Sequence, residues 1–213
     1  MTPPADVDTL TEETFVRAIS ELTSAAPELA SVIGRWGMPP FWTHEPGFEG
    51  LVLAILSQQV SLESAEAAFA KLAQRIVEIT PGRFLALDDA TLREIGFSRQ
   101  KAGYVRGLAE AVLDGGMDLQ AVGRMADDEV RTALVGIKGI GPWTADTYLL
   151  FSLRRPDAWP SGDLALAKAI QDLRGLASIP SYPELDRIAE GWRPWRGVAA
   201  RILWHHYLRT RGR

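Results

Sequence analysis

The sequence contains no cysteine among its 213 residues. This absence excludes disulfide bonds, a thiol nucleophile, an iron–sulfur cluster and a thiolate zinc site, and it fits a reducing compartment. Long apolar runs are also missing, since the longest, residues 51–56, is far too short to cross a bilayer. The N-terminus lacks the basic and apolar regions of a signal peptide. We therefore expect a soluble protein with no membrane partner.

An excess of positive charge is also absent. The chain has 23 Lys and Arg against 27 Asp and Glu, which gives a net charge of −4 at pH 7. This balance excludes a strongly cationic protein that coats nucleic acid, but DNA binding through a local site stays open because local contacts decide it. With 46% hydrophobic residues, the chain can bury a core as one domain or as two closely packed lobes.

No segment alternates apolar and polar residues between hairpin turns, which argues against a β-sheet. Helical periodicity dominates instead, and it predicts a compact all-α protein of about a dozen short helices. The expected helices span residues 11–25, 27–37, 47–58, 61–79, 88–95, 98–114, 118–123, 127–135, 142–153, 164–173, 182–190 and 195–209. Pro- and Gly-rich pairs, including Pro81-Gly82, predict breaks between them.

Residues 134–145, with the sequence LVGIKGIGPWTA, are the most informative segment. Gly139 and Gly141 suit a tight turn in which a β-carbon would interfere, and Pro142 suits the first turn of a following helix. The segment predicts a helix, a hairpin and a helix N-terminus whose free N–H groups can bind a phosphate oxygen. Lys138 would add a direct charge. An ordinary turn between helices is the alternative, but the complete string favours phosphate binding.

Asp163 follows the flexible turn WPSG and precedes an apolar helical run. Its position by itself favours a helix N-cap. A carboxylate near bound DNA is repelled by phosphates, so a catalytic role would explain such a placement, and the two roles are compatible. In residues 57–61, SQQVS, paired amides could read base edges or fill a gap in a duplex, although a polar turn is the simpler interpretation.

Seven tryptophans occur, and core packing is their usual role. Trp143 differs because it lies in the first turn after the hairpin. Trp195 and Trp204 are nine residues apart, so they face opposite sides of a helix and at most one can line a given cavity.

Together these segments resemble the helix-hairpin-helix DNA glycosylases, and within them the DNA-3-methyladenine glycosylase II (alkylbase glycosylase) branch. The resemblance is to the compact form, which lacks an N-terminal α/β domain. It extends from about residue 45 to residue 208, in the family's order and spacing. It is carried by residues 51–61 (LVLAILSQQVS), 138–145 (KGIGPWTA), 160–166 (PSGDLAL) and 192–196 (WRPWR), with Trp204.

The resemblance implies a two-lobed helical glycosylase fold. A terminal lobe would comprise residues 1–50 and 155–213, and a helical bundle with the helix-hairpin-helix would comprise residues 51–154. The active-site cleft would lie between the lobes.

The resemblance also implies site residues. Asp163 corresponds to the catalytic aspartate, and the base pocket would include Trp143, Trp204 and Thr147. The residues expected to bind DNA are Gln58, Gln59, Lys138, Gly139, Gly141 and Thr144, of which the two glutamines belong to the loop that enters the duplex.

A monovalent cation, Na⁺ or K⁺, often binds main-chain carbonyls of the hairpin in this family, here those of Val135, Ile137 and Ile140. Bifunctional members carry a lysine where this chain has Trp143, and without that amine the strand-cutting lyase reaction has no nucleophile. Members with an iron–sulfur cluster use four C-terminal cysteines, which this chain lacks. No cofactor should therefore be required.

The activity implied is hydrolysis of the N-glycosidic bond to alkylated bases, such as 3-methyladenine and 7-methylguanine, in duplex DNA at the start of base excision repair. We expect a monomer in a bacterial-type cytoplasm, at the nucleoid while on DNA. The alternatives are a non-catalytic helix-hairpin-helix protein that binds DNA structures, a glycosylase for oxidised or mismatched bases, and a helical interaction scaffold.

Overall fold

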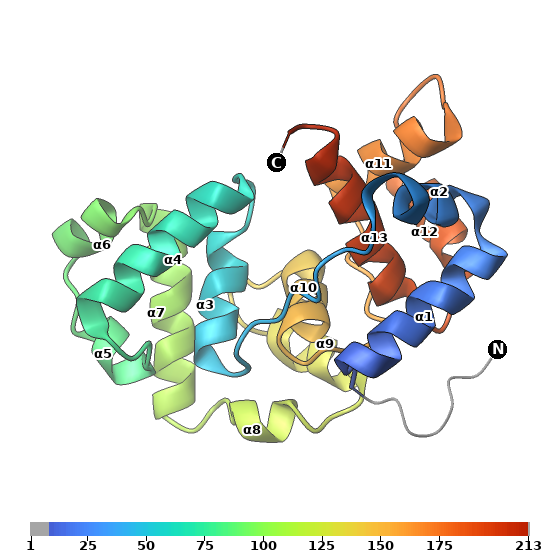
Figure 1. The fold of residues 1–213 in the computed structure, drawn as a ribbon. Coiled ribbons are helices and arrows are strands. Elements are labelled where there is room, and N and C mark those ends of the chain that lie inside the picture. The colour runs from blue at the N-terminus through green and yellow to red at the C-terminus, as the bar shows by residue number, and fades with distance from the viewer. Residues whose placement is uncertain (1–8, 213) are drawn as a thin grey trace. The chain divides into compact units, whose positions relative to one another are not determined.

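The computed structural model describes residues 9–212, which form thirteen helices and no strand (Figure 1). The predicted all-α fold is confirmed. No helix among the described residues combines the length and the apolar character that a membrane span needs. The helices are α1 Glu12–Ala25, α2 Pro27–Trp36, α3 Phe48–Leu56, α4 Leu62–Ile76, α5 Pro81–Leu85, α6 Asp89–Ile95, α7 Arg99–Leu113, α8 Leu119–Val122, α9 Asp127–Val135, α10 Pro142–Phe151, α11 Leu164–Arg174, α12 Tyr182–Glu190 and α13 Arg196–Arg209.

Helix α5 corrects the sequence-based prediction, in which Pro81-Gly82 was a break. Pro81 instead occupies the first helical position, where its missing N–H costs nothing. The hydroxyl of Thr80 accepts a hydrogen bond from the N–H of Arg83 at 3.4 Å and caps the helix. Phe84 then points into the core and is fully buried. Proline therefore starts a helix here.

The chain divides into two compact units. Unit 1 combines the described residues up to Thr43 with those from Leu149 onward, and unit 2 comprises His44–Tyr148. The expected divisions, after residues 50 and 154, lie a few residues further along the chain. Within unit 2, the N–H of Gly47 donates to the Tyr148 hydroxyl at 2.8 Å, a contact between its first and last residues. The second division falls inside α10.

Unit 1 is built around α13, which packs against α1, α2, α11 and α12 (Figure 1, red). Six consecutive residues, from Val198 to Leu203, are fully buried. A helix buried on every side belongs in the middle of a unit, so segments from both ends of the chain enclose α13.

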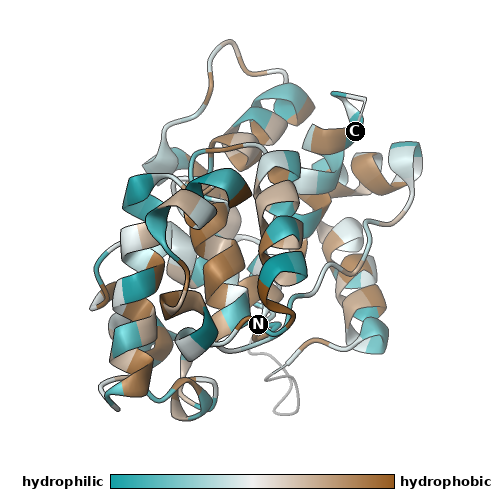
Figure 2. Cartoon of the chain, turned by 90° about the vertical axis from the view of Figure 1, so that its left-hand side faces the viewer, coloured by the Kyte–Doolittle hydropathy of each residue, from teal (hydrophilic) through white to brown (hydrophobic). Residues whose placement is uncertain are grey.

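Unit 2 is built around α3, which packs against α4 and α7. Its residues from Gly50 to Leu56 are all buried, so the longest apolar run of the sequence lies in the core of this unit. Helix α5 packs on α7, and α6 packs on both α4 and α7. Most other helices have one apolar and one polar face, visible as brown and teal bands on the same ribbon in Figure 2.

Candidate functional site

The predicted helix-hairpin-helix is confirmed in unit 2, where α9 leads through residues 136–141 into α10. The turn closes with two short-range hydrogen bonds. The N–H of Ile137 donates to the Leu134 carbonyl at 3.0 Å, and the N–H of Ile140 donates to the Ile137 carbonyl at 3.1 Å. Pro142 opens α10, as expected. The hairpin is therefore built from main-chain interactions that the sequence string specifies.

The structure requires glycine at position 139 of the hairpin, whereas at position 141 it does not. Gly139 has φ of +95°, and a β-carbon there would lie 2.1 Å from Cγ of Tyr104 in α7. The positive φ and the close approach of Tyr104 both require glycine at position 139, as predicted. Gly141 has no positive φ, and a β-carbon would meet no atom of the protein within 4 Å. The expectation that the turn itself requires glycine at position 141 is therefore wrong.

The two glutamines that follow α3 are placed differently. Gln58 is half-buried, and its Nε2 donates to the Gly139 carbonyl at 2.8 Å and to Oγ1 of Thr144 at 2.9 Å. Gln59 is exposed and has φ of +54°, a left-handed conformation that is strained for a residue with a β-carbon. Gln58 thus braces the hairpin from inside unit 2, whereas Gln59 is presented at the surface.

The first turns of α10 contain three of the expected site residues. Trp143 is half-buried, whereas the side chains of Thr144 and Thr147 are buried. The Thr147 hydroxyl donates to the Thr144 carbonyl at 2.9 Å, so both threonine hydroxyls are engaged inside the unit. What Thr144 can offer to a ligand is its main-chain N–H, which lies in the first helical turn and has no acceptor within the helix. Lys138, at the tip of the turn, is exposed.

The three carbonyls expected to hold a cation belong to the same turn. The Ile137 carbonyl accepts the turn hydrogen bond from Ile140 and keeps a second lone pair. The carbonyls of Val135 and Ile140 belong to the same turn, and each carbonyl oxygen has two lone pairs. The donor set, three neutral carbonyl oxygens, is compatible with a monovalent cation, since backbone carbonyls replace the hydration shell of K⁺ in channels.

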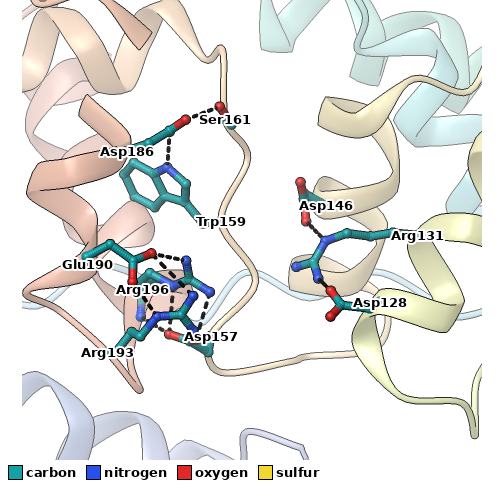
Figure 3. Close-up of polar contacts among 10 residues, drawn as sticks. All are labelled: Asp128, Arg131, Asp146, Asp157, Trp159, Ser161, Asp186, Glu190, Arg193 and Arg196. Carbon is teal, nitrogen blue, oxygen red and sulfur yellow. Dashed lines mark hydrogen bonds and ion pairs between the residues drawn. The ribbon is translucent and has the colours of Figure 1, made fainter. Parts of the chain in front are cut away.

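An ion pair joins the two helices of the hairpin motif. Nε of Arg131 in α9 donates to Oδ1 of Asp146 in α10 at 2.6 Å, and Nη1 of Arg131 donates to Asp128 at 2.7 Å (Figure 3). Asp146 is buried, whereas the Asp128 side chain is 97% exposed. Burial lowers the pKa of Arg131, but the charge and hydrogen bond of Asp146 outweigh it and raise that pKa overall. The half-buried pair joins α9 to α10.

Two further residues of α7 support this region, and sequence reasoning missed both. Nζ of Lys101 donates to the Leu56 carbonyl at 2.6 Å, so it caps the end of α3 just before the two glutamines. Burial lowers the pKa of Lys101 below its ordinary value. Tyr104 packs its ring on Gly139 and accepts a hydrogen bond from Gln100 at 2.6 Å. Neither contact leaves a signal in the sequence, because both join segments far apart along the chain.

Asp163 lies in unit 1 as the N-cap of α11. Its Oδ1 accepts a hydrogen bond from the N–H of Leu166 at 2.9 Å, and its side chain is buried. The predicted cap is therefore confirmed. The preceding turn is closed by Gly162 with φ of +83° and by a hydrogen bond from the Asp163 N–H to the Pro160 carbonyl at 3.3 Å. The carboxylate is thus held in one orientation by the helix that it begins.

The loop that leads to Asp163 is fixed in two places. Upstream, Asp157 accepts hydrogen bonds from Arg193 and Arg196, which in turn contact Glu190 (Figure 3). Closer to Asp163, the carboxylate of Asp186 in α12 binds both Trp159 and Ser161. The sequence gives no indication of this contact, because 27 positions separate Asp186 from Trp159.

Trp204 in α13 stacks on Phe151, with ring centroids 5.3 Å apart and an angle of 25° between the planes. The guanidinium of the buried Arg201 also lies over the Phe151 ring, 4.9 Å from its centroid, and its Nη2 donates to the Leu150 carbonyl at 2.7 Å. Burial lowers the pKa of Arg201 to about 9, which leaves it charged at neutral pH.

The other tryptophan of this region, Trp195, is buried and donates a hydrogen bond to Glu21 at 2.7 Å, so it belongs to the core.

Comparison with known proteins places these features in a family. Residues 52–194 match the model of the HhH-GPD superfamily base excision DNA repair protein. An alkylbase DNA glycosidase-like protein of Schizosaccharomyces pombe is 29% identical over 198 residues, which cover 89% of this chain and 92% of the relative. The DNA-3-methyladenine glycosylase 1 of the same yeast is 29% identical over 190 residues, which cover 87% and 83%. Among solved structures, a 3-methyladenine DNA glycosylase from this yeast in complex with abasic DNA superposes with a TM-score of 0.81, at 26% identity over 92% of this chain and 97% of that one.

Proposed function

This chain belongs to the HhH-GPD superfamily of base excision DNA repair proteins, and we propose that it is a monofunctional DNA glycosylase for alkylated bases. It would hydrolyse the N-glycosidic bond of 3-methyladenine, 7-methylguanine and similar bases in duplex DNA. The observation that carries the proposal is the buried, helix-capping carboxylate of Asp163. The relatives that act on alkylated bases support the choice of substrate.

In this proposal the hairpin holds the DNA backbone beside the lesion. A phosphate oxygen approaches the first turn of α10, where main-chain N–H groups and the positive end of the helix dipole favour an anion. The absence of a side chain on Gly141, which the protein's own packing does not require, supports close approach by a ligand. Lys138 adds charge at the same turn. These contacts carry no sequence information, as suits an enzyme that searches for damage.

Chemistry on a base requires that the nucleotide leave the stack, at a cost of a few kcal/mol that damage reduces. We assign Gln59 to the gap that remains. Its exposure and its strained left-handed backbone support this role, because such strain is found where function compensates for it. Gln58 supports the hairpin from inside the protein instead, through its two hydrogen bonds.

A 3-alkyladenine or 7-alkylguanine nucleoside is already cationic, so its base can leave without a strong general acid. One carboxylate then suffices. Asp163 would stabilise the positive charge that develops on the sugar and orient or deprotonate the attacking water. Because this chain has Trp143 where lyase members carry lysine, no amine attacks the sugar and the DNA strand stays intact.

Trp143 and Trp204 would hold the cationic base against their π faces, each contributing about 0.5–2 kcal/mol. The stacking of Trp204 on Phe151 supports this role, because it fixes the indole plane before the base arrives. Thr147 is assigned to the floor of the pocket through its methyl group, since its hydroxyl is engaged by the Thr144 carbonyl.

The proposal includes a monovalent cation on the carbonyls of Val135, Ile137 and Ile140. When bound, such an ion would supply positive charge at the hairpin. The turn geometry supports it, since the carbonyls retain lone pairs for a ligand. The reaction itself requires no cofactor. We place the protein in the cytoplasm as a monomer, at the nucleoid while it is on DNA.

The test is release of free bases from methylated duplex DNA, with the products separated by base. Asp163→Asn should abolish release while DNA affinity and thermal stability stay close to those of the parent protein, because asparagine caps a helix about as well as aspartate. The alternative is a non-catalytic DNA-structure-binding protein, in which Asp163 serves only as the cap. That alternative predicts no base release by the parent protein.

A further inference from the structure

We propose that Asp186 is a positioning residue that fixes the loop carrying Asp163, an inference that rests on the proposed function of Asp163. Its Oδ1 accepts a hydrogen bond from the indole Nε1 of Trp159 at 2.9 Å, and its Oδ2 accepts one from the Ser161 hydroxyl at 2.7 Å (Figure 3). Both donors belong to the few residues that precede Asp163. Each oxygen of the carboxylate thus holds one point of the loop.

The loop at residues 159–163 contains turns and no helix. Between residues 159 and 163, two hydrogen bonds close the turn, one from the Ser161 N–H to the Trp159 carbonyl at 2.9 Å and the 3.3 Å bond from Asp163 to Pro160. Gly162, at φ of +83°, adds a flexible point directly before Asp163. Such a segment needs side-chain contacts to keep one conformation.

The packing of Trp159 makes its hydrogen bond with Asp186 a rigid restraint on the loop. Its indole is 5% exposed and packs edge-to-face on Trp192, with centroids 5.8 Å apart at 62°. A buried indole N–H needs an acceptor, and Asp186 provides it. The indole therefore cannot rotate without losing its packing and its hydrogen bond together. Asp186 transmits this restraint to Ser161, two residues before Asp163.

Other contacts fix the loop on either side of this point. Upstream, Asp157 is bound by Arg193 and Arg196 at 2.5–3.1 Å. Downstream, Asp163 is bound by the Leu166 N–H. Asp186, from α12, binds Trp159 and Ser161, which lie between these two restraints along the chain. Its partners are two neutral donors, so its role is to orient the loop.

Misplacement of a catalytic group by about 1 Å can lower a rate about 100-fold. We expect Asp186→Ala to lower the single-turnover rate of base release by about 10- to 100-fold, with the Kd for DNA unchanged. Asp186→Asn should keep most of the rate. Its side-chain oxygen still accepts from Trp159, and the Ser161 hydroxyl can rotate to accept from the amide N–H.

Leu185→Ala is the matched control. Leu185 is fully buried in the same helix, so its truncation loosens α12 without removing the Asp186 carboxylate. The control should lower the Tm and leave the rate unchanged at temperatures where the protein is folded. Equal losses of rate in Asp186→Ala and Leu185→Ala would overturn the positioning role, as would full activity of Asp186→Ala.

A second measurement does not depend on activity. Hydrogen exchange of the Leu166 amide reports whether the Asp163 carboxylate still caps α11. Asp186→Ala should speed this exchange relative to Leu185→Ala, and unchanged exchange would overturn the inference. If the parent protein releases no base, the proposed function fails by itself, and the Leu166 amide still decides whether Asp186 positions Asp163.

Discussion

The ring of Tyr104 occupies the space that a side chain on Gly139 would need. Alanine at position 139 would press its β-carbon on the ring and also adopt φ of +95°. We therefore expect Gly139→Ala to lower the free energy of unfolding by more than about 1 kcal/mol and to weaken DNA binding. Gly141→Ala is the control for the fold, since nothing in the protein meets its β-carbon. Thermal denaturation should separate the two variants, and DNA titration should show a loss for both.

The two neighbouring glutamines should give opposite results. Gln58→Leu removes both hydrogen bonds to the hairpin, so we expect it to cost about 1–2 kcal/mol of stability. Gln59→Gly relieves the left-handed strain at φ of +54°, so its Tm should equal or exceed that of the parent, while base release falls because the side chain that fills the gap is gone. Tm values and single-turnover rates for both variants test the assignment. A stable Gln58→Leu, or a fully active Gln59→Gly, would contradict it.

Arg131 has one buried and one exposed carboxylate partner, Asp146 and Asp128, so the contributions of the two partners to stability can be compared. Asp146→Asn weakens the buried partner of Arg131, and we expect a loss of about 1–3 kcal/mol. Asp128→Asn changes its exposed partner and should alter stability by less than about 0.5 kcal/mol. Chemical denaturation of the two variants gives this difference. If both variants lose the same stability, the pair does not hold the helices together as described.

His205 makes stability depend on pH. Burial lowers its pKa below the ordinary value of 6.5; the hydrogen bond with the Trp36 carbonyl opposes this shift, and the charges of Arg209 and His206 reinforce it. Below pH 6.5 the unfolded chain therefore takes up a proton that the folded chain does not. The stabilisation from neutral His205 is present above pH 6.5 and is lost as the pH falls through the folded pKa.

Unfolding free energies measured for the parent protein and for His205→Asn between about pH 7.5 and pH 5 test this expectation. The parent should lose more stability than the variant over that range. Parallel curves would show that His205 does not titrate differently on folding.

Local patterns in the sequence predicted the helices and the hairpin because both depend on nearby residues. The turn at Gly139 and the cap at Asp163 involve residues within four positions of each other, so spacing specifies them. Helix α5 was missed because Pro81-Gly82 looks the same whether it ends a helix or begins one. Only the hydroxyl of Thr80 and the burial of Phe84 distinguish the two cases.

Supports that act across the fold could not be predicted in the same way. Tyr104 lies against Gly139, and Asp186 holds Trp159, although 35 and 27 positions separate the partners. Gln58 was expected to contact DNA together with Gln59, and the sequence could not show that its amide turns inward to the hairpin. Such contacts depend on how the helices pack, and a single sequence carries no periodic signal for them.

The enclosure of α13 by helices from both ends of the chain has a consequence for biosynthesis. Unit 2 is one continuous stretch, so it can mature on the ribosome while later residues are still being added. Helices α1 and α2 are synthesised before unit 2, but their core is complete only when α13 has been synthesised. A translation product that ends before α13 would retain the hairpin and Gln59, but it would lack the helix against which α11, the helix that Asp163 caps, packs. During translation, unit 2, which we propose binds the DNA backbone, would thus be able to fold before unit 1, which carries Asp163.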